Sequence, residues 1–329
     1  MRIIGLEEHC WTPEIGEALA RLGPEQRDDS VALFQTSEIV ARLEDLGEGR
    51  LRQMDVIGLD HTVLSVATPG TQVLPPDQAV ALARQANDRL AGAVRAHPDR
   101  FSAFATLPTP DPATAAREFK RAVQDLGLKG AMIHGRTEDH YLDHEDFRPV
   151  LAVAAELAVP IYIHPQIAPK AVRALYYDGF GPKLSVGLAA GGWGWHVEAG
   201  VTAIRLIVAG VFDQFPSLQI ILGHWGEMIT FYLERAAGIS RWTETLKLPV
   251  EDYFRHNFHV TASGMYSTPY LMRAIEVMGV DRVMYSTDYP FQYHADGMAR
   301  SFLEKAPLSF DDRAKIAHSN AEKLLKLPR

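Results

Sequence analysis

A carboxylate and an imidazole stand two residues apart near the start of the sequence. Glu7 and His9 follow residues 2–5, a short and largely apolar run that predicts a buried β-strand. Side chains two apart on a strand point to the same face, so Glu7 and His9 should lie side by side. An oxygen and a nitrogen in that arrangement supply half of the ligands of a divalent metal ion. The alternative is a strand end with two unrelated polar side chains.

Other metal-ligating residues also follow short apolar runs, namely His134, His164, His224 and Asp288. A single histidine in such a place is more often structural than functional. If the strand ends meet in one place, however, these side chains can share one ion. Glu7, His9, His164 and Asp288 together would offer two nitrogens and two oxygens. That set suits Zn²⁺, Mn²⁺ or Fe²⁺, and we expect one divalent ion per chain, Zn²⁺ or Mn²⁺.

Eight short apolar runs alternate with helical patterns along the chain, at residues 2–5, 61–65, 101–105, 128–133, 159–163, 219–222, 258–261 and 282–285. Strict alternation predicts a parallel sheet, and eight such units predict a closed (β/α)8 TIM barrel of the α/β class. In a barrel, the carboxyl ends of all the strands share one mouth. The alternative is an open doubly wound sheet. The sequence lacks the Gly-x-Gly-x-x-Gly and phosphate-loop motifs of the nucleotide-binding open sheets.

We expect one domain over residues 1–329, with an insertion after the fifth strand and helices at the end of the chain, over about 295–303 and 310–325. The insertion, Gln166 to about Trp195, is rich in glycine and should form a lid or pocket wall without regular elements. A helix is expected from about Gly226 to Ala237, with Glu227 one turn after His224 on the same face.

The composition excludes several classes of partner. The chain has 33 Lys and Arg against 41 Asp and Glu, a formal net charge of −8, which argues against nucleic acid and anionic membranes. The single cysteine, Cys10, excludes an internal disulfide and fits a reducing compartment. Its position on the strand points it away from Glu7 and His9, so we expect a buried structural thiol. No signal sequence or membrane-spanning run is visible, and a cytoplasmic location is expected.

Four segments resemble motifs of the amidohydrolase superfamily: Glu7-x-His9, Ile163-His164-Pro165, residues 222–227 (LGHWGE) and residues 286–291 (STDYPF). More narrowly, they resemble the metal-dependent non-oxidative decarboxylases of that superfamily, such as the γ-resorcylate and 2,3-dihydroxybenzoate decarboxylases. The first strand carries Glu-x-His where many hydrolases of the superfamily carry His-x-His, which favours the decarboxylase branch. A binuclear site would use a lysine at the end of strand four, whereas Lys129 stands at its start.

The resemblance implies a role for individual residues. It assigns the metal to Glu7, His9, His164 and Asp288. It makes His224 the catalytic histidine, Glu227 its carboxylate partner and Asp288 the candidate proton carrier. The expected substrate contacts are Arg50, His134, Trp193, Arg235 and Phe291. Arg235 would lie near a subunit interface, in a homodimer or homotetramer.

Two departures from the γ-resorcylate decarboxylase pattern leave the ring substituents of the substrate open. His134 stands where an asparagine is expected, and Trp195-His196 also differ. His196 opens a helix, and capping or surface exposure is the simpler interpretation of it.

The expected reaction is loss of CO₂ from a small aromatic acid with a hydroxyl ortho to its carboxylate, with the direction of the reaction open. No organic cofactor is needed, because the ortho-hydroxyl and the carboxylate can chelate the metal together. One alternative is a hydrolase, in which Asp288 activates a metal-bound water against a lactone or amide. A second is a non-catalytic binding protein that keeps the barrel and its metal.

Overall fold

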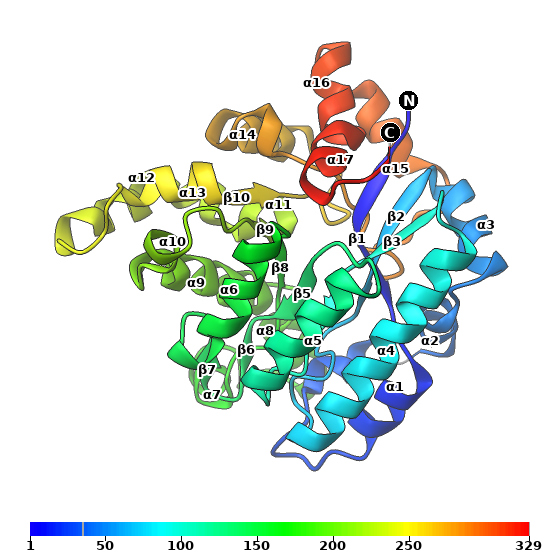
Figure 1. Cartoon of the computed structure of the whole chain (residues 1–329), viewed down its shortest axis with the longest axis horizontal. Coiled ribbons are helices and arrows are strands. Elements are labelled where there is room, and N and C mark those ends of the chain that lie inside the picture. The colour runs from blue at the N-terminus through cyan, green and yellow to red at the C-terminus, as the bar shows by residue number, and fades with distance from the viewer. Residues whose placement is uncertain (35, 329) are drawn as a thin grey trace.

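The computed structural model describes residues 1–34 and 36–328 of the chain. Within this part, parallel strands form the centre, and helices such as α4, α5 and α6 cover them from outside (Figure 1). The strands are β1 (Ile4–Cys10), β2 (His61–Val66), β3 (Phe101–Ala103), β4 (Ala105–Thr106), β5 (Ala131–His134), β6 (Arg136–Thr137), β7 (His140–Tyr141), β8 (Ile161–His164), β9 (Ile220–Leu222) and β10 (Phe258–Val260). The antiparallel pair β6–β7 stands apart from the parallel strands.

The ring of parallel strands closes through a segment that is not a regular strand. One sheet has the order β1-β2-β3 and the other β10-β9-β8-β5-β4, and only Phe104 separates β3 from β4. The two remaining edges are bridged by a later segment, in which Val283 pairs with Val260 and Tyr289 pairs with Glu8, both in parallel. The expected (β/α)8 barrel is therefore present, with its eighth strand reduced to two isolated bridges.

The helices after the strands often begin at a proline or a capping residue. α4 has Pro76 in its first turn, and Asp111 caps α5 by accepting a hydrogen bond of 3.0 Å from Thr114 N. The helices are α1 (Pro13–Ala20), α2 (Ser37–Glu44), α3 (Glu48–Ile57), α4 (Pro76–Ala96), α5 (Pro112–Gln124), α6 (Arg148–Leu157), α7 (Lys170–Tyr176), α8 (Pro182–Ala189), α9 (Gly194–Val208), α10 (Val211–Gln214), α11 (His224–Glu227), α12 (Ile229–Ala236), α13 (Val250–Asn257), α14 (Thr268–Met278), α15 (Met298–Lys305), α16 (Phe310–Ala314) and α17 (Asn320–Leu325). None of these helices, within residues 1–34 and 36–328, is long and apolar enough to cross a membrane.

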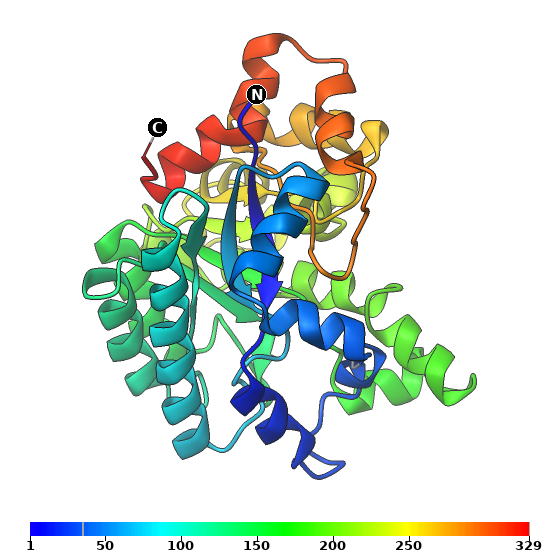
Figure 2. The ribbon, with the colours of Figure 1, turned by 90° about the vertical axis from the view of Figure 1, so that its right-hand side faces the viewer.

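The inside of the barrel is filled by apolar side chains from successive strands: Ile4, Leu6, Val63, Phe104, Met132, Tyr162, Ile221 and Met284. Each such side chain removed from water contributes roughly 1.5–3 kcal/mol. Leu325 of α17 and the following Leu327 pack against the same cluster. Both chain ends lie at this side of the molecule (Figure 2), where Arg2 Nη1 lies 2.9 Å from Glu322 Oε1.

The insertion after β8 contains regular helices, so the expectation that it lacks regular elements was wrong, although its last residues do form a pocket wall. α7 and α8 form there because Gly179 and Gly181 stand between the two helices rather than inside them. Ile167, Tyr177, Ala189, Ala190 and Trp195 bury a small apolar cluster of their own. The insertion lies beside the segment that follows β1 (Figure 2), where α8 contacts the 3₁₀ turn Asp29–Leu33.

The side chains of β1 lie on two opposite faces of the strand, as predicted. Cys10 is buried and its thiol donates to the carbonyl of Ser65, and burial raises its pKa to about 11. Glu8, on the same face, accepts hydrogen bonds from the backbone and the hydroxyl of Thr287, at 2.8 and 2.6 Å. Glu7 and His9 therefore point together toward the mouth of the barrel.

Candidate metal centre and active site

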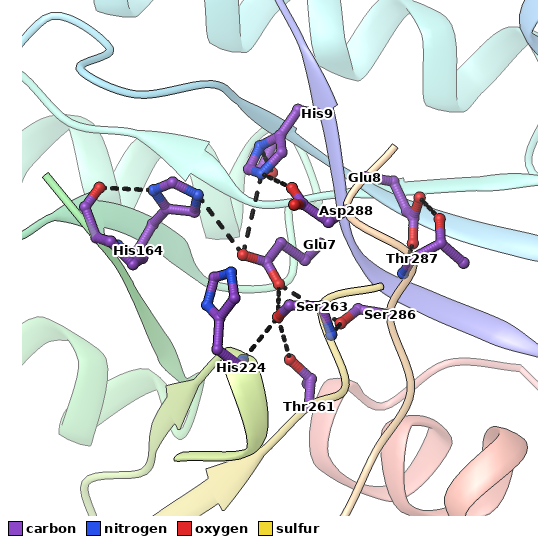
Figure 3. A network of polar contacts seen from close by, with 12 residues as sticks. Glu7, Glu8, His9, His164, His224, Thr261, Ser263, Ser286, Thr287 and Asp288 are labelled. Carbon is purple, nitrogen blue, oxygen red and sulfur yellow. Dashed lines mark hydrogen bonds and ion pairs between the residues drawn. The ribbon is translucent and has the colours of Figure 1, made fainter. Parts of the chain in front are cut away.

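The carboxylate of Glu7 lies at the centre of a polar cluster at the carboxyl ends of the strands (Figure 3). Glu7 is buried, and its Oε2 accepts a hydrogen bond of 2.7 Å from the hydroxyl of Tyr162 on β8. The hydroxyl of Ser263 donates to the same oxygen. These contacts fix the carboxylate, whereas its Oε1 has no hydrogen-bond partner among the described residues. A buried oxygen without a partner is costly unless another group binds it.

Two histidines present ring nitrogens to this oxygen. His164 Nε2 lies 3.6 Å and His9 Nε2 lies 4.0 Å from Glu7 Oε1. His164 Nδ1 lies 2.8 Å from the carbonyl oxygen of Pro165, which can only accept, so we place the proton of this ring on Nδ1. Burial lowers the pKa of His164 well below its usual value, and His9 nearby adds to this effect. His164 is therefore neutral, and its Nε2 keeps a lone pair for a ligand.

Asp288 brings a second carboxylate to the cluster. Its Oδ1 lies 3.3 Å from His9 Nε2. Asp288 follows the segment that closes the barrel and has a φ of 58°, in the left-handed region, which aspartate tolerates better than most residues. The structure therefore brings together all four residues that the sequence suggested as ligands: Glu7, His9, His164 and Asp288.

The donor atoms of this cluster fit a divalent metal ion. Ligand atoms of Glu7, His9 and His164 all lie within 4.8 Å of one another. Glu7 Oε1 and His9 Nε2 are both buried and lack hydrogen-bond partners within the described chain, as expected of atoms that bind an ion. Nitrogen donors combined with carboxylate oxygens suit Zn²⁺ or Mn²⁺.

The backbone beside this cluster, the short element α11 and the following Met228, forms a left-handed turn where a right-handed helix was expected. The φ values are positive at His224 (50°), Trp225 (58°), Gly226 (93°), Glu227 (51°) and Met228 (68°). Residues other than glycine adopt this region at a cost of about 1–2 kcal/mol each. Contacts with the segment after β10 hold the turn, since His224 N donates to Ser263 Oγ at 2.9 Å. The helix expected from Gly226 begins only at Ile229.

The turn brings His224 and Glu227 into contact, with 2.8 Å between His224 Nδ1 and Glu227 Oε1. Burial opposes the charge on His224, but the charge and hydrogen bond of Glu227, together with the charges of Glu7 and Asp288, outweigh burial and raise the pKa of His224 to about 10. Burial likewise opposes the charge on Glu227, and His224 nevertheless lowers the pKa of that carboxyl to about 2. While Glu7 and Asp288 keep their negative charges, the pair is therefore a charged histidine held by a carboxylate.

His196 is a further member of this group that the sequence analysis treated as a cap or surface residue. Its Nδ1 lies 2.9 Å from Glu227 Oε2, so the carboxylate lies between two histidines. No sequence pattern indicates this contact, because His196 and Glu227 belong to different elements, α9 and the left-handed turn.

A cavity of about 620 Å³ opens beside His224 and Asp288. Trp193 and Phe291, which were expected as pocket walls, both line it, together with Phe34, Trp195, His196, Met228, Phe231, Tyr232 and Tyr270. The rings of Phe34 and Phe291 lie 4.8 Å apart. Flat apolar walls with charged groups at one end suit a small planar acid.

Three expected substrate contacts lie outside the lining of this cavity. Arg50 is buried behind β1, where it donates to the carbonyl of His9 and lies over the ring of Tyr289 at 4.5 Å. It supports the backbone of a metal-site residue and does not face the cavity. Arg235 is exposed on α12.

His134 is buried at the end of β5, with its ring centroid 5.2 Å from that of His164. Burial lowers the pKa of His134 to about 3, so the ring is neutral. It lies behind His164 and does not line the cavity.

The fold and the cluster together define an amidohydrolase. The amidohydrolase family model matches residues 36–327, and the chain belongs to this family. The γ-resorcylate decarboxylase of Polaromonas sp. (strain JS666 / ATCC BAA-500) is 37% identical over 338 residues, which cover 99% of each chain. The expected family resemblance is thereby confirmed.

Two similar crystal structures contain a metal ion and an aromatic ligand. The 5-carboxyvanillate decarboxylase of Novosphingobium aromaticivorans, complexed with manganese and 4-hydroxy-3-methoxy-5-nitrobenzoic acid, is 37% identical with a TM-score of 0.90, covering 99% of this chain and 96% of that one. The dihydroxybenzoic acid decarboxylase of Polaromonas sp. JS666, with bound manganese and the inhibitor 2-nitroresorcinol, is 35% identical with a TM-score of 0.86, covering 100% and 98%.

Proposed function

We propose that this protein catalyses the metal-dependent, non-oxidative decarboxylation of an aromatic acid with a hydroxyl next to its carboxylate. The observation that carries the proposal is the cluster of Glu7, His9, His164 and Asp288, which lies beside the His224–Glu227 pair and a cavity with aromatic walls. The similar decarboxylases, which span the whole chain, support it. We assign the metal to these four residues and propose that the chain forms one domain.

The chemistry explains why such a site needs a proton carrier as well as a metal. Direct loss of CO₂ from an aromatic ring would leave an aryl carbanion that the ring cannot stabilise. Protonation of the carboxyl-bearing carbon beforehand lets the electrons of the breaking C–C bond return to the ring. A divalent ion held by the four residues supplies a positive charge that binds and polarises the acid.

The remaining steps belong to side chains of this chain. The charges of Glu7 and Asp288 also raise the pKa of His224, and a bound metal ion would offset them. His224, held by Glu227 at Nδ1 and unprotonated at Nε2, would then take the proton of the ring hydroxyl, and the resulting negative oxygen increases the electron density at the ring carbon. Asp288, which lines the cavity, is the candidate to deliver a proton to that carbon, for which its carboxyl group would have to be protonated beforehand. Trp193 and Phe291 hold the ring between flat walls, and these walls exclude water from the charges.

The ligands of the similar structures support a substrate with neighbouring hydroxyl and carboxylate groups. In 4-hydroxy-3-methoxy-5-nitrobenzoic acid and in 2-nitroresorcinol, a nitro group stands next to a ring hydroxyl. A nitro group has the planar, two-oxygen shape of a carboxylate but cannot leave as CO₂. We infer that a hydroxyl in that position comes within reach of His224 in this chain.

A matched pair of isomers tests the proposal. With one divalent metal bound, we expect CO₂ release from 2,6-dihydroxybenzoate to be at least about tenfold faster than from 3,5-dihydroxybenzoate, since a site built for a polar group rejects analogues that lack it there. CO₂ release is measured with each acid, and lactones are assayed in parallel. Equal rates on both acids would remove the role of the ortho-hydroxyl. Activity on lactones alone would identify a hydrolase with Asp288 as its base.

We also propose that the chain assembles with copies of itself, as a homodimer or homotetramer. Large aromatic side chains are exposed at Phe231 and Tyr232 of α12, which line the cavity, and at Trp242 in the 3₁₀ turn after α12, which is 83% exposed. Such a patch is typical of an interface in a soluble protein. Arg235, exposed on the same helix, would lie within it.

Light scattering at assay concentration should therefore report at least a dimer, with closed symmetry. Replacing Trp242 by glutamate should shift the distribution toward monomer, whereas the same change at Leu175, which is exposed on the distant α7, should not. A monomer in the unaltered protein would contradict the proposed assembly.

A further inference from the structure

Each oxygen of the Glu227 carboxylate contacts a different histidine. His224 Nδ1 lies 2.8 Å from Oε1, and His196 Nδ1 lies 2.9 Å from Oε2. The two rings lie close together, with 4.5 Å between their centroids and 62° between their planes. Glu227 is 1% exposed, so its charge has little contact with water. The two histidines therefore provide the compensation that a buried carboxylate needs.

The second nitrogen of His196 has an acceptor opposite it as well. His196 Nε2 lies 3.2 Å from the carbonyl oxygen of Gly191. A carboxylate and a carbonyl both only accept hydrogen bonds, so each ring nitrogen of His196 faces an acceptor. His196 thus links two structures, the buried carboxylate and the turn before α9.

A single hydrogen bond would leave the Glu227 carboxylate free to rotate about its last side-chain bond. Rotation would remove the acceptor from His224 Nδ1 and allow the proton of the ring to move to either nitrogen. With both oxygens held, His224 keeps its Nδ1 proton on Glu227. The Nε2 atom of His224 is then available to a molecule in the cavity, since no hydrogen bond to that atom occurs within the described residues.

We propose that His196 is a positioning residue that acts through Glu227 and thereby fixes the orientation and tautomer of His224 for the reaction. The inference rests on the proposed function and assigns one more residue a part in that reaction. The competing explanation is purely structural: His196 would only tie the turn at Gly191 to α9, and its contact with Glu227 would have no effect on the reaction.

The two contacts of His196 can be separated by substitution. In His196→Asn, the amide nitrogen takes the place of Nδ1, so the donor to Glu227 remains and the contact with Gly191 is lost. In His196→Gln, the amide nitrogen takes the place of Nε2, so the reverse holds. His196→Leu removes both donors at similar volume. His256→Asn, at an exposed position of α13, is the matched control.

We expect His196→Gln and His196→Leu to lower kcat about tenfold or more, the usual scale for a group that orients an active-site residue, with KM changed less than about threefold. His196→Asn should keep most of kcat, and His256→Asn should match the unaltered protein. Adding His196→Gln to Glu227→Gln should cause little further loss, because both changes act on one pathway. The positioning role is wrong if His196→Gln keeps its activity and His196→Asn loses it. It is also wrong if the losses caused by His196→Gln and Glu227→Gln multiply in the double variant.

A second measurement does not depend on turnover. Proton and nitrogen NMR of the metal-free protein should show a hydrogen-bonded Nδ1–H of His224 that exchanges slowly with water in the unaltered chain and in His196→Asn. In His196→Gln, the Nδ1–H signal of His224 should shift and exchange faster with water, because Glu227 is no longer held on both sides. An unchanged His224 signal in His196→Gln would overturn the inference. Absence of CO₂ release from every ortho-hydroxy acid by the unaltered protein would instead contradict the proposed function, and the NMR result would still decide the role of His196.

Discussion

Replacing His164 by alanine should remove the metal ion and lower turnover by more than about a hundredfold. Even outer contacts of a metal site change affinity or activity by about 10–100-fold, and His164 offers its Nε2 directly to the cluster. Its Nε2 keeps a lone pair for the ion, because the carbonyl of Pro165 fixes the proton of the ring on Nδ1. The check is elemental analysis after dialysis against a chelator, with CO₂ release measured on the same samples.

Asp288→Ala should behave in the same way, and His256→Ala, on an exposed face of α13, provides the control. Tyr162→Phe should have an intermediate effect, about tenfold in metal affinity, because it removes one of the donors that fix Glu7. Full metal content in both His164→Ala and Asp288→Ala would show that the ion lies elsewhere.

His224→Ala should leave the metal content unchanged and still lower turnover by about a hundredfold or more, the usual contribution of an acid–base group. The reason is its position: His224 contacts Glu227 and lines the cavity but is not part of the donor cluster of Glu7, His9 and His164. The measurements are kcat, metal content and circular dichroism on the same preparation.

Glu227→Gln removes the negative charge at this position but keeps the size of the side chain, since an amide has nearly the same size as a carboxylate. We expect it to lose most of the turnover as well, because the charge of Glu227 is the largest of the effects that raise the pKa of His224. Near-normal turnover in His224→Ala, with metal retained, would reduce His224 to a structural residue.

The parts of the site that were predictable follow from local rules. Alternation along β1 places Glu7 and His9 on one face and Cys10 on the other, and this depends only on the strand. Parallel strands end at the same side of a sheet, which explains why His164 and Asp288 come together with residues far away in the sequence.

The parts that were not predictable depend on tertiary contacts. Of the left-handed turn from His224 to Met228, only Gly226 carries a signal for positive φ, and the other residues adopt it because of contacts with the strands beside them. The contact between His196 and Glu227 depends on that turn. Arg50 was predicted as a substrate contact, but its helix places it behind β1.

The closing segment of the barrel also dictates when the active site can first exist. The hydrogen bond between Thr287 and Glu8 spans 279 residues, and Asp288 joins His9 across the same distance in the chain. During synthesis, β1 leaves the ribosome long before this segment. Until the segment is made, the backbone groups on one edge of β1 have no strand to pair with. Contacts so distant in sequence form slowly and late. Capture of the metal by the full set of ligands therefore follows completion of the barrel, and a partly synthesised chain has no complete site to load.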